Sequence, residues 1–312
     1  MLKRLERTQR ADPYLFENSI RRELDAAERW VEERNTKRRE GGKQPLTDQA
    51  RKRNFAEGLS RALAPRVASA LRPRFVGIFP DEHGGRQESR ARTAKGFKKL
   101  DVNYSTPELG LGLGVSIKTI NFRDPATNRY TKNYTRADAE LRAEASDYHD
   151  RQPYAVMIGI VFIPVDACDD GTDAPSSFGG AVQTFRFRAG RQGPAEPSVL
   201  FERVFIGLYE GTEPASRGQI GFFDVMKAPP RHGRPRSTLN FRQLIDEIIE
   251  TYDNRNNPAF QWADAEPERV SPPSADEELD AIEEEGEDDE PPGSPQQELA
   301  APEASGHRLN LQ

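Results

Sequence analysis

The longest uninterrupted apolar stretch of the sequence is YAVMIGIVFI, residues 154–163. An apolar run without polar alternation is typical of a strand that is covered on both faces, as at the centre of an α/β sheet. The stretch has about half of the roughly 20 residues that a membrane helix needs. We therefore expect a buried central strand with helices packed on both sides of its sheet.

Helical and strand-type patterns surround this stretch up to about residue 261. Apolar residues recur at helical spacing at 13–34, at 48–72 with a kink at Pro65, at 135–150 and at 240–255. Strands are predicted at 74–79, 98–105, 114–122, 154–164, 181–189, 202–210 and 220–226. This order of elements indicates an α/β domain around a mixed sheet.

Charge divides the chain into a basic body and an acidic end. The net charge is −6, yet residues 262–312 hold 16 acidic and 2 basic residues, which leaves 43 basic against 35 acidic residues before them. We expect an N-terminal helical arm (1–46), an α/β domain (47–261) and a disordered acidic tail (262–312). A basic body indicates a polyanion-binding surface, although ordinary surface charge explains the numbers equally well.

The tail has two interpretations. It is a solubilising extension, or its carboxylates mimic a phosphate backbone and compete for the basic surface. The second interpretation predicts that deletion of residues 265–312 raises the affinity for DNA.

Several classes of protein are disfavoured by composition. Cys168 is the only cysteine, which rules out a disulfide within the chain and argues against a cysteine-ligated zinc site. The four histidines show no metal-binding spacing, and the first ten residues, MLKRLERTQR, contain no apolar signal core. We expect a soluble protein of a reducing compartment, the cytoplasm, without a membrane partner.

Three alternating glycines precede a lysine in PELGLGLGVSIKTINF, residues 107–122. A phosphate-binding loop of the Walker type needs GxxxxGK[ST] between a strand and a helix, whereas Lys118 lies within a strand pattern. The kinase loop is excluded because no HRD or DFG motif occurs in the chain. The glycines instead let a phosphodiester backbone approach the strand, or permit a bend.

Lys118 has a candidate partner on the preceding strand. Asp101 interrupts an apolar segment there, and a hairpin would bring its carboxylate next to the ammonium group of Lys118. Such a pair can bind a divalent cation and a phosphate group. The alternative is a plain salt bridge, or a lysine stem that covers the sheet edge.

The order helix, strand, aspartate-bearing strand, lysine-bearing strand, helix, buried strand resembles the core of the PD-(D/E)XK nucleases over about residues 47–164. Asp101 in LDV and Lys118 in SIK match the acid and the lysine of that motif, 17 residues apart. The resemblance implies a restriction-endonuclease-like αβββαβ core, extended here by C-terminal strands and a helix. It also implies a DNA endonuclease that uses Mg²⁺ or Mn²⁺ and serves in restriction or anti-phage defence.

The chain departs from the motif at Ser116, where the family has Glu or Asp. Glu108 in the turn between the two strands and Glu57 on the first core helix are candidates to replace this acid as metal ligands, with Glu88 third. The site would then consist of Asp101, Lys118 and one of these glutamates. Loss of the acid could instead leave a nuclease fold that binds nucleic acid without cutting it, within a larger complex, or a scaffold that recruits partners.

Two basic segments flank the predicted site and are candidates to contact DNA. The first contributes Arg123, Arg129, Lys132 and Arg136, and the second Arg90 and Lys95. The alternative is that they are solvated surface loops. Further expected partners are proteins of a defence complex and a second copy of the chain, since cutting both strands of a duplex commonly takes two active sites.

Overall fold

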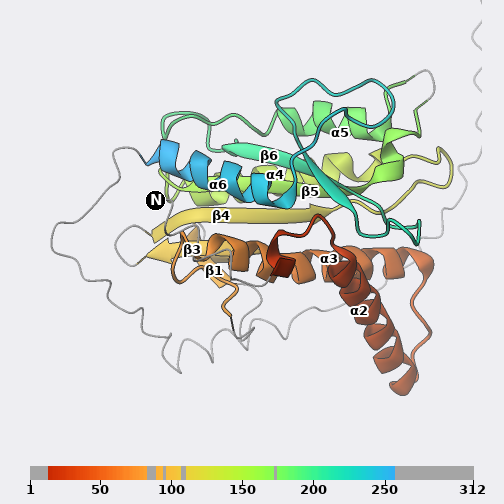
Figure 1. Cartoon of the computed structure of the whole chain (residues 1–312). Coiled ribbons are helices and arrows are strands. Elements are labelled where there is room, and N and C mark those ends of the chain that lie inside the picture. The colour runs from red at the N-terminus through yellow and green to blue at the C-terminus, as the bar shows by residue number, and fades with distance from the viewer. Residues whose placement is uncertain (1–12, 83–88, 94–95, 107–109, 172–173, 257–312) are drawn as a thin grey trace, which may run out of the picture. The chain divides into compact units, whose positions relative to one another are not determined.

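The computed structural model describes residues 13–82, 89–93, 96–106, 110–171 and 174–256. These residues form an α/β fold built on a five-stranded mixed sheet (Figure 1). The predicted tail, 262–312, lies outside the described residues. No helix among the described residues is both long enough and apolar enough to cross a membrane.

The sheet has the order β3-β4-β5-β6-β7. Its strands are β3 (Val102–Thr106), β4 (Gly110–Thr119), β5 (Val156–Pro164), β6 (Arg203–Tyr209) and β7 (Ile220–Asp224). The central strands β4, β5 and β6 run parallel, whereas β3 and β7 at the edges are antiparallel to their neighbours. A separate hairpin of β1 (Ser89–Thr93) and β2 (Gly96–Leu100) precedes β3.

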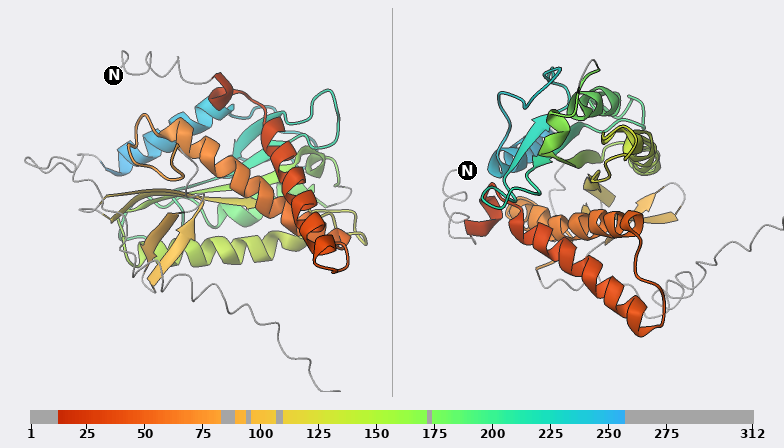
Figure 2. Two further views of the ribbon diagram at one scale, coloured as in Figure 1. Left: turned by 90° about the horizontal axis from the view of Figure 1, so that it is seen from below. Right: turned by 90° about the vertical axis from the view of Figure 1, so that its right-hand side faces the viewer.

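Helices cover both faces of the sheet. On one face lie α2 (Arg21–Glu40), α3 (Asp48–Leu71) and α6 (Phe241–Arg255), and on the other α4 (Tyr134–His149) and α5 (Ser177–Arg186). The right-hand view of Figure 2 shows α2 and α3 on the opposite side of the strands from α4 and α5. Short 3₁₀ turns occupy Pro13–Phe16 (η1), Thr131–Asn133 (η2) and Val165–Cys168 (η3).

The apolar stretch at 154–163 forms β5, as predicted. All its strand residues except Pro164 are buried, because β4 and β6 flank it and helices cover both faces. Its side chains alternate between two cores: Ile158 and Ile160 pack with α3 and α6, whereas Met157 and Val161 pack with α4 and α5. The uninterrupted apolar pattern follows from this two-sided burial.

The strand predicted at 181–189 is wrong, since residues 177–186 form helix α5. The hydroxyl of Ser176 caps the helix by accepting from the N–H of Gly179. Phe178, Val182 and Phe185 recur at helical spacing and are fully buried. The alternating residues FRFR at 185–188 have a pattern typical of a strand, but they lie at the C-terminal end of helix α5.

Two other boundaries also differ from expectation. Residues 74–79 form turns, with a single bridge between Phe79 and Asn103, rather than a strand. Helix α3 continues through Pro65 to Leu71, and the first long helix begins at Arg21 instead of residue 13. The helices predicted at 135–150 and 240–255 correspond to α4 and α6.

Candidate active site

The glycines of β4 allow close packing within the sheet. A Cβ atom at Gly114 would lie 2.7 Å from the sulfur of Met157 and 3.0 Å from a methyl group of Leu100. At Gly112 it would meet the ring of Tyr104 at 3.2 Å. Side chains already fill the space beside both glycines, so these two positions offer no approach to a phosphate backbone.

Asp101 lies in the bend immediately before β3. Pairing of β3 with β4 begins at Val102 and Val115, so Asp101 comes next to the segment from Ser116 to Lys118. Its Oδ2 accepts a hydrogen bond from the backbone N–H of Ile117 at 2.6 Å. The carboxylate thereby takes the place of a strand carbonyl, and this bond fixes it beside the lysine strand.

Helix α4 brings a second carboxylate to the same strand. Glu144 accepts a hydrogen bond from the Ser116 hydroxyl at 2.5 Å through Oε2, and its Oε1 lies 2.5 Å from Lys118 Nζ. The side chains of Lys118 and Glu144 are 20% and 23% exposed, so the pair is largely removed from water. Asp101, Lys118 and Glu144 with Ser116 form what we call the DKE cluster.

The charge state of Lys118 follows from these neighbours. Burial by itself would lower the pKa of its ammonium group, but attraction and hydrogen bonding by Glu144, with weaker attraction by Asp101 and Glu140, outweigh it. The pKa of Lys118 is therefore raised above its ordinary value of 10.5. Lys118 stays positively charged at neutral pH and can balance negative charge, but cannot accept a proton.

The DKE cluster has the ligand chemistry of a magnesium site. Two carboxylates and a hydroxyl are hard oxygen donors, and Mg²⁺ in proteins is commonly held by one or two carboxylates together with water and substrate phosphate. Among the described residues, no group of three or more His, Cys, Asp or Glu side chains is arranged to hold a metal ion. With Asp101 and Glu144 as its only protein ligands, such a site would need water and substrate oxygens to complete it.

The glutamates predicted as replacement acids lie elsewhere. Glu57 is on α3, on the opposite face of the sheet from α4, and pairs with Arg34 at 3.1 Å near the surface. No contact that the structure describes joins it to the DKE cluster. Glu108 and Glu88 lie outside the described residues.

Glu144 was missed by the sequence prediction, although a signal existed. Arg136, Glu140 and Glu144 recur every four residues and so form one stripe along α4. Glu140 pairs with Arg136 at 2.7 Å and lies 4.0 Å from Lys118. This stripe marks Glu144 as a candidate on the helix after the lysine strand, but it does not show which strand residue Glu144 meets.

Four of the six predicted DNA-binding residues have described side chains, and these four fall into two groups. Arg123 pairs with Asp166 at 2.7 Å, and Arg129 donates to the carbonyl of Pro175, so both hold loops within the protein. Lys132 and Arg136 are 63% and 75% exposed. Arg90 lies in β1 without a described side chain, and Lys95 lies outside the described residues.

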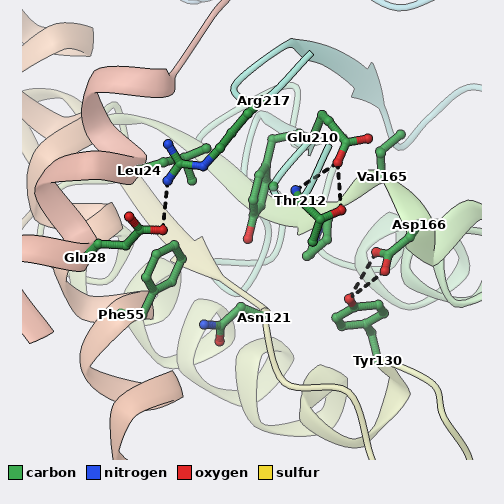
Figure 3. A pocket seen from close by; sticks show the side chains of 13 residues that line it. Leu24, Glu28, Phe55, Asn121, Tyr130, Val165, Asp166, Glu210, Thr212 and Arg217 are labelled. Carbon is green, nitrogen blue, oxygen red and sulfur yellow. Dashed lines mark hydrogen bonds and ion pairs between the residues drawn. The ribbon is translucent and has the colours of Figure 1, made fainter. Parts of the chain in front are cut away.

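A cavity of about 180 Å³ lies at the carboxyl ends of β4, β5 and β6 (Figure 3). Its polar groups are bound to one another or to nearby backbone: the Tyr130 hydroxyl donates to Asp166, Arg217 pairs with Glu28, and Glu210 accepts from Thr212. Asp101, Lys118 and Glu144 do not line it. Since carboxylates outnumber its one arginine, the cavity is unsuited to a phosphate group.

A buried ionic cluster surrounds Glu202, just before β6. Its carboxylate accepts from the N–H of Met157 at 2.7 Å and pairs with Arg191 at 3.1 Å, while Nε2 of His149 lies 3.6 Å away. His149 is fully buried at the end of α4, and its Nδ1 lies 3.0 Å from the carbonyl of Ser198. This cluster fixes α4, β5 and β6 relative to one another.

Comparison of the chain with protein-family models, with curated proteins and with solved structures finds no match. The α/β fold and the DKE cluster are therefore the observations from which a function is argued.

Proposed function

We propose that this chain is a metal-dependent endonuclease that hydrolyses phosphodiester bonds in DNA. The observation that carries the proposal is the meeting of Asp101, Lys118 and Glu144 at one place, with two carboxylates beside a protonated lysine. The order α3, β3, β4, α4, β5 supports it in part, because it follows the PD-(D/E)XK order that the sequence resembles except at the first core strand, where residues 74–79 form turns. A role in restriction or anti-phage defence rests on that resemblance alone.

Glu144 would replace the acid that the motif lacks at Ser116. The Ser116 hydroxyl donates a hydrogen bond that orients the Glu144 carboxylate. The second carboxylate of the site would then come from a helix instead of the lysine strand. This exchange keeps two acids and one lysine in the site.

Each residue of the DKE cluster has a definite task in such a reaction. Asp101 and Glu144 would hold Mg²⁺ or Mn²⁺, which lowers the pKa of a bound water and neutralises charge on the phosphate. Lys118, protonated at neutral pH, would balance the charge that develops on the phosphate oxygens during attack. Phosphate oxygens and Glu144 would compete for the same ammonium group, so substrate binding would loosen the Lys118–Glu144 pair.

A nuclease fold that binds nucleic acid without cutting it is the second candidate. The observation that favours it is the direct pairing of Glu144 with Lys118, in which the two groups neutralise each other. In this function Lys132 and Arg136 would contribute to a backbone-binding surface, while the DKE cluster would be structural.

Incubation of the purified protein with supercoiled plasmid and Mg²⁺ separates the two functions. We expect nicked and linear products from the parent chain. Asp101→Asn, Lys118→Met and Glu144→Gln should each lower the cleavage rate by at least about 100-fold, as removal of a preorganised charge at a reaction centre does. Circular dichroism and thermal unfolding of each variant check that it is folded.

Glu57→Gln is the matched control, because it removes an acid that lies on the other face of the sheet. It should leave the cleavage rate close to that of the parent. DNA binding without cleavage by the parent would favour the second candidate. Loss of cleavage in Glu57→Gln but not in Glu144→Gln would contradict the assignment of the second acid.

A further inference from the structure

We propose that the tip of the α2–α3 helical hairpin, residues 34–53, binds the phosphate backbone of a DNA duplex near the carboxyl end of the lysine strand β4. The inference rests on the proposed function, since it assigns a surface for the same substrate. We call this segment the hairpin tip. In Figures 1 and 2 the end of α2 and the loop that joins it to α3 extend away from the sheet.

The hairpin tip carries a concentrated positive charge. Residues 34–53 contain two acidic residues, Glu40 and Asp48, against eight basic ones: Arg34, Lys37, Arg38, Arg39, Lys43, Arg51, Lys52 and Arg53. A surface that binds DNA by its backbone needs such clustered lysines and arginines, because each neutralised phosphate releases counterions.

Half of the basic side chains hold the hairpin together. Arg34 pairs with Glu57, Arg51 pairs with Glu32, and Arg38 donates to the carbonyl of Gln44. Lys52 lies over the ring of Phe122 at 4.9 Å. These contacts stabilise the hairpin tip and its position against the rest of the fold. The other four basic side chains are exposed to solvent.

Lys37, Arg39, Lys43 and Arg53 are the outward cations. All four are exposed, and none of them forms an ion pair within the described part of the chain. They are available to the phosphates of a ligand without the loss of an internal partner.

Helix stability does not account for this charge. Lys37 and Arg39 lie in the last turn of α2, where cations favour the helix dipole. Residues 51–53, however, form a basic run near the start of α3, where the dipole favours acids instead. Lys43 lies in the loop between the helices. Arg51 is compensated by Glu32, so the charges that remain for solvent or an external ligand here are those of Lys43 and Arg53.

Hydrogen bonds close the loop of the hairpin tip and cap the helix that follows it. Asn35 is buried, and its Oδ1 accepts from the N–H of Leu46 at 3.0 Å, which closes the loop. The hydroxyl of Thr47 caps α3 by accepting from the N–H of Ala50. A preformed surface loses little conformational entropy on binding.

The hairpin tip is also tied to the end of the lysine strand. The side-chain amide of Asn121, three residues beyond Lys118, donates to the carbonyl of Lys52 at 3.0 Å. About two turns further along α3, the Ser60 hydroxyl lies 3.2 Å from that of Thr119. A duplex held by the hairpin tip would therefore approach the carboxyl end of β4 from the face of the sheet opposite Glu144, and would have to extend past that end to reach Lys118.

Duplex binding by the full chain, measured without divalent metal so that no strand is cut, tests the inference. The test variant is Lys37→Gln, Arg39→Gln, Lys43→Gln, and the control Arg151→Gln, Lys227→Gln, Arg236→Gln removes three exposed cations of other surfaces. We expect the test variant to weaken binding by about 500-fold at roughly 0.1 M salt, because three phosphate contacts are lost and each is worth roughly eightfold. The slope of log K against log salt should fall by about 0.9 for each lost contact.

A second variant, Lys43→Gln, Arg53→Gln, leaves both cations in the last turn of α2 unchanged and so avoids their effect on helix stability. This variant should lower the affinity for the duplex more than any pair of the three control substitutions does. Suppose that the parent chain binds and cuts DNA. Equal losses of DNA affinity in the test and control variants would then overturn the inference about the hairpin tip, but not the proposed nuclease function. If the parent chain binds DNA through the hairpin tip but does not cut it, only the proposed hydrolysis is overturned. If the parent chain neither binds nor cuts DNA, both the proposed hydrolysis and the proposed DNA-binding surface are overturned.

Discussion

Ser116 is small enough to let helix α4 bring the Glu144 carboxylate to the lysine strand. Its side chain is fully buried and donates to Glu144, whose carboxylate occupies the side of β4 on which Lys118 also lies. A longer acidic residue at 116 would bring a third carboxylate against Glu144 and Asp101. The chain therefore has room for one acid from the strand or one from the helix, but not for both.

Exchange of the two positions tests this reasoning. Ser116→Glu alone should destabilise the protein, because like charges then share a buried space. The double variant Ser116→Glu, Glu144→Ser should recover part of the stability and part of the cleavage that Glu144→Ser loses. Plasmid cleavage and thermal unfolding of the three variants measure the recovery. A double variant no more active than Glu144→Ser would show that the positions are not interchangeable.

Glu202 makes the stability of the fold sensitive to acid. Burial alone would raise the pKa of its carboxyl group, but His149, the N–H of Met157 and Arg191 outweigh burial and lower the pKa below 4.5. Its stabilising contribution is thus present above the unfolded pKa of 4.5 and is lost as the pH falls through the folded pKa.

Glu202→Gln should therefore lower the free energy of unfolding at neutral pH by about 3–5 kcal/mol, as expected when one partner of a buried ion pair is removed. The difference between parent and variant should shrink as the pH falls below 4.5. Urea unfolding at a series of pH values measures both effects. A difference that does not change with pH would contradict the ionic role of Glu202.

At the scale of elements, the contact between α2 and α3 depends on Gly58. A Cβ atom there would lie 2.9 Å from Cδ1 of Trp30 and 3.1 Å from its Cβ and Cγ. The rings of Trp30 are in turn flanked by Arg34 at 4.6 Å and Arg61 at 4.8 Å. Glycine therefore sets how closely the two helices of the hairpin approach.

Gly58→Ala should destabilise the protein by about 1–3 kcal/mol, because the extra methyl group overpacks the contact despite the better helix propensity of alanine. Gly180→Ala in α5 is the matched control, since the nearest atom to its Cβ would be 3.8 Å away. It should stabilise the protein by about 0.5–1 kcal/mol. Denaturant unfolding compares the two, and changes of the same sign would refute the packing argument.

Elements were predictable from sequence where one pattern dominated. The continuous apolar run predicted β5, because a strand covered on both faces has apolar residues at every position. Long periodic segments predicted α4 and α6, because a helix buried on one face has apolar residues at helical spacing. Helix α5 was misassigned because a short apolar helix and a buried strand have similar composition. Asp101 and Lys118 could be singled out because each interrupts an apolar segment, although Asp101 lies in the bend between β2 and β3 and not within a strand.

The contribution of Glu144 could not be derived in the same way. Its place in the site depends on how α4 crosses β4, and that is set by packing between Leu141, Ala145 and the strands rather than by local sequence. Sequence patterns indicate which face of a helix is polar, but not which strand residue it meets. The predicted replacement acids, Glu108, Glu57 and Glu88, therefore did not include Glu144.

At the scale of the whole molecule, the opposite charges of body and tail predict an effect on DNA binding. Deletion of residues 265–312 removes most of the acidic residues that follow 261 and turns the net charge from negative to positive. If the tail competes for the basic surface, the shortened chain should bind a duplex more tightly, most strongly at low salt. Equal affinity of the two chains at matched salt would leave the tail as a solubilising extension.

Helix α3 links two distant parts of the molecule. Its 24 residues form one continuous helix, about 36 Å long at 1.5 Å per residue, and Pro65 does not divide it. Its first turns belong to the hairpin tip, while Ser60 contacts Thr119, the neighbour of Lys118. Because the helix is continuous, a ligand bound to its first turns would bind the same rigid element that contacts the lysine strand through Ser60. We therefore expect a displacement of the outer end of α3 to be transmitted to Thr119.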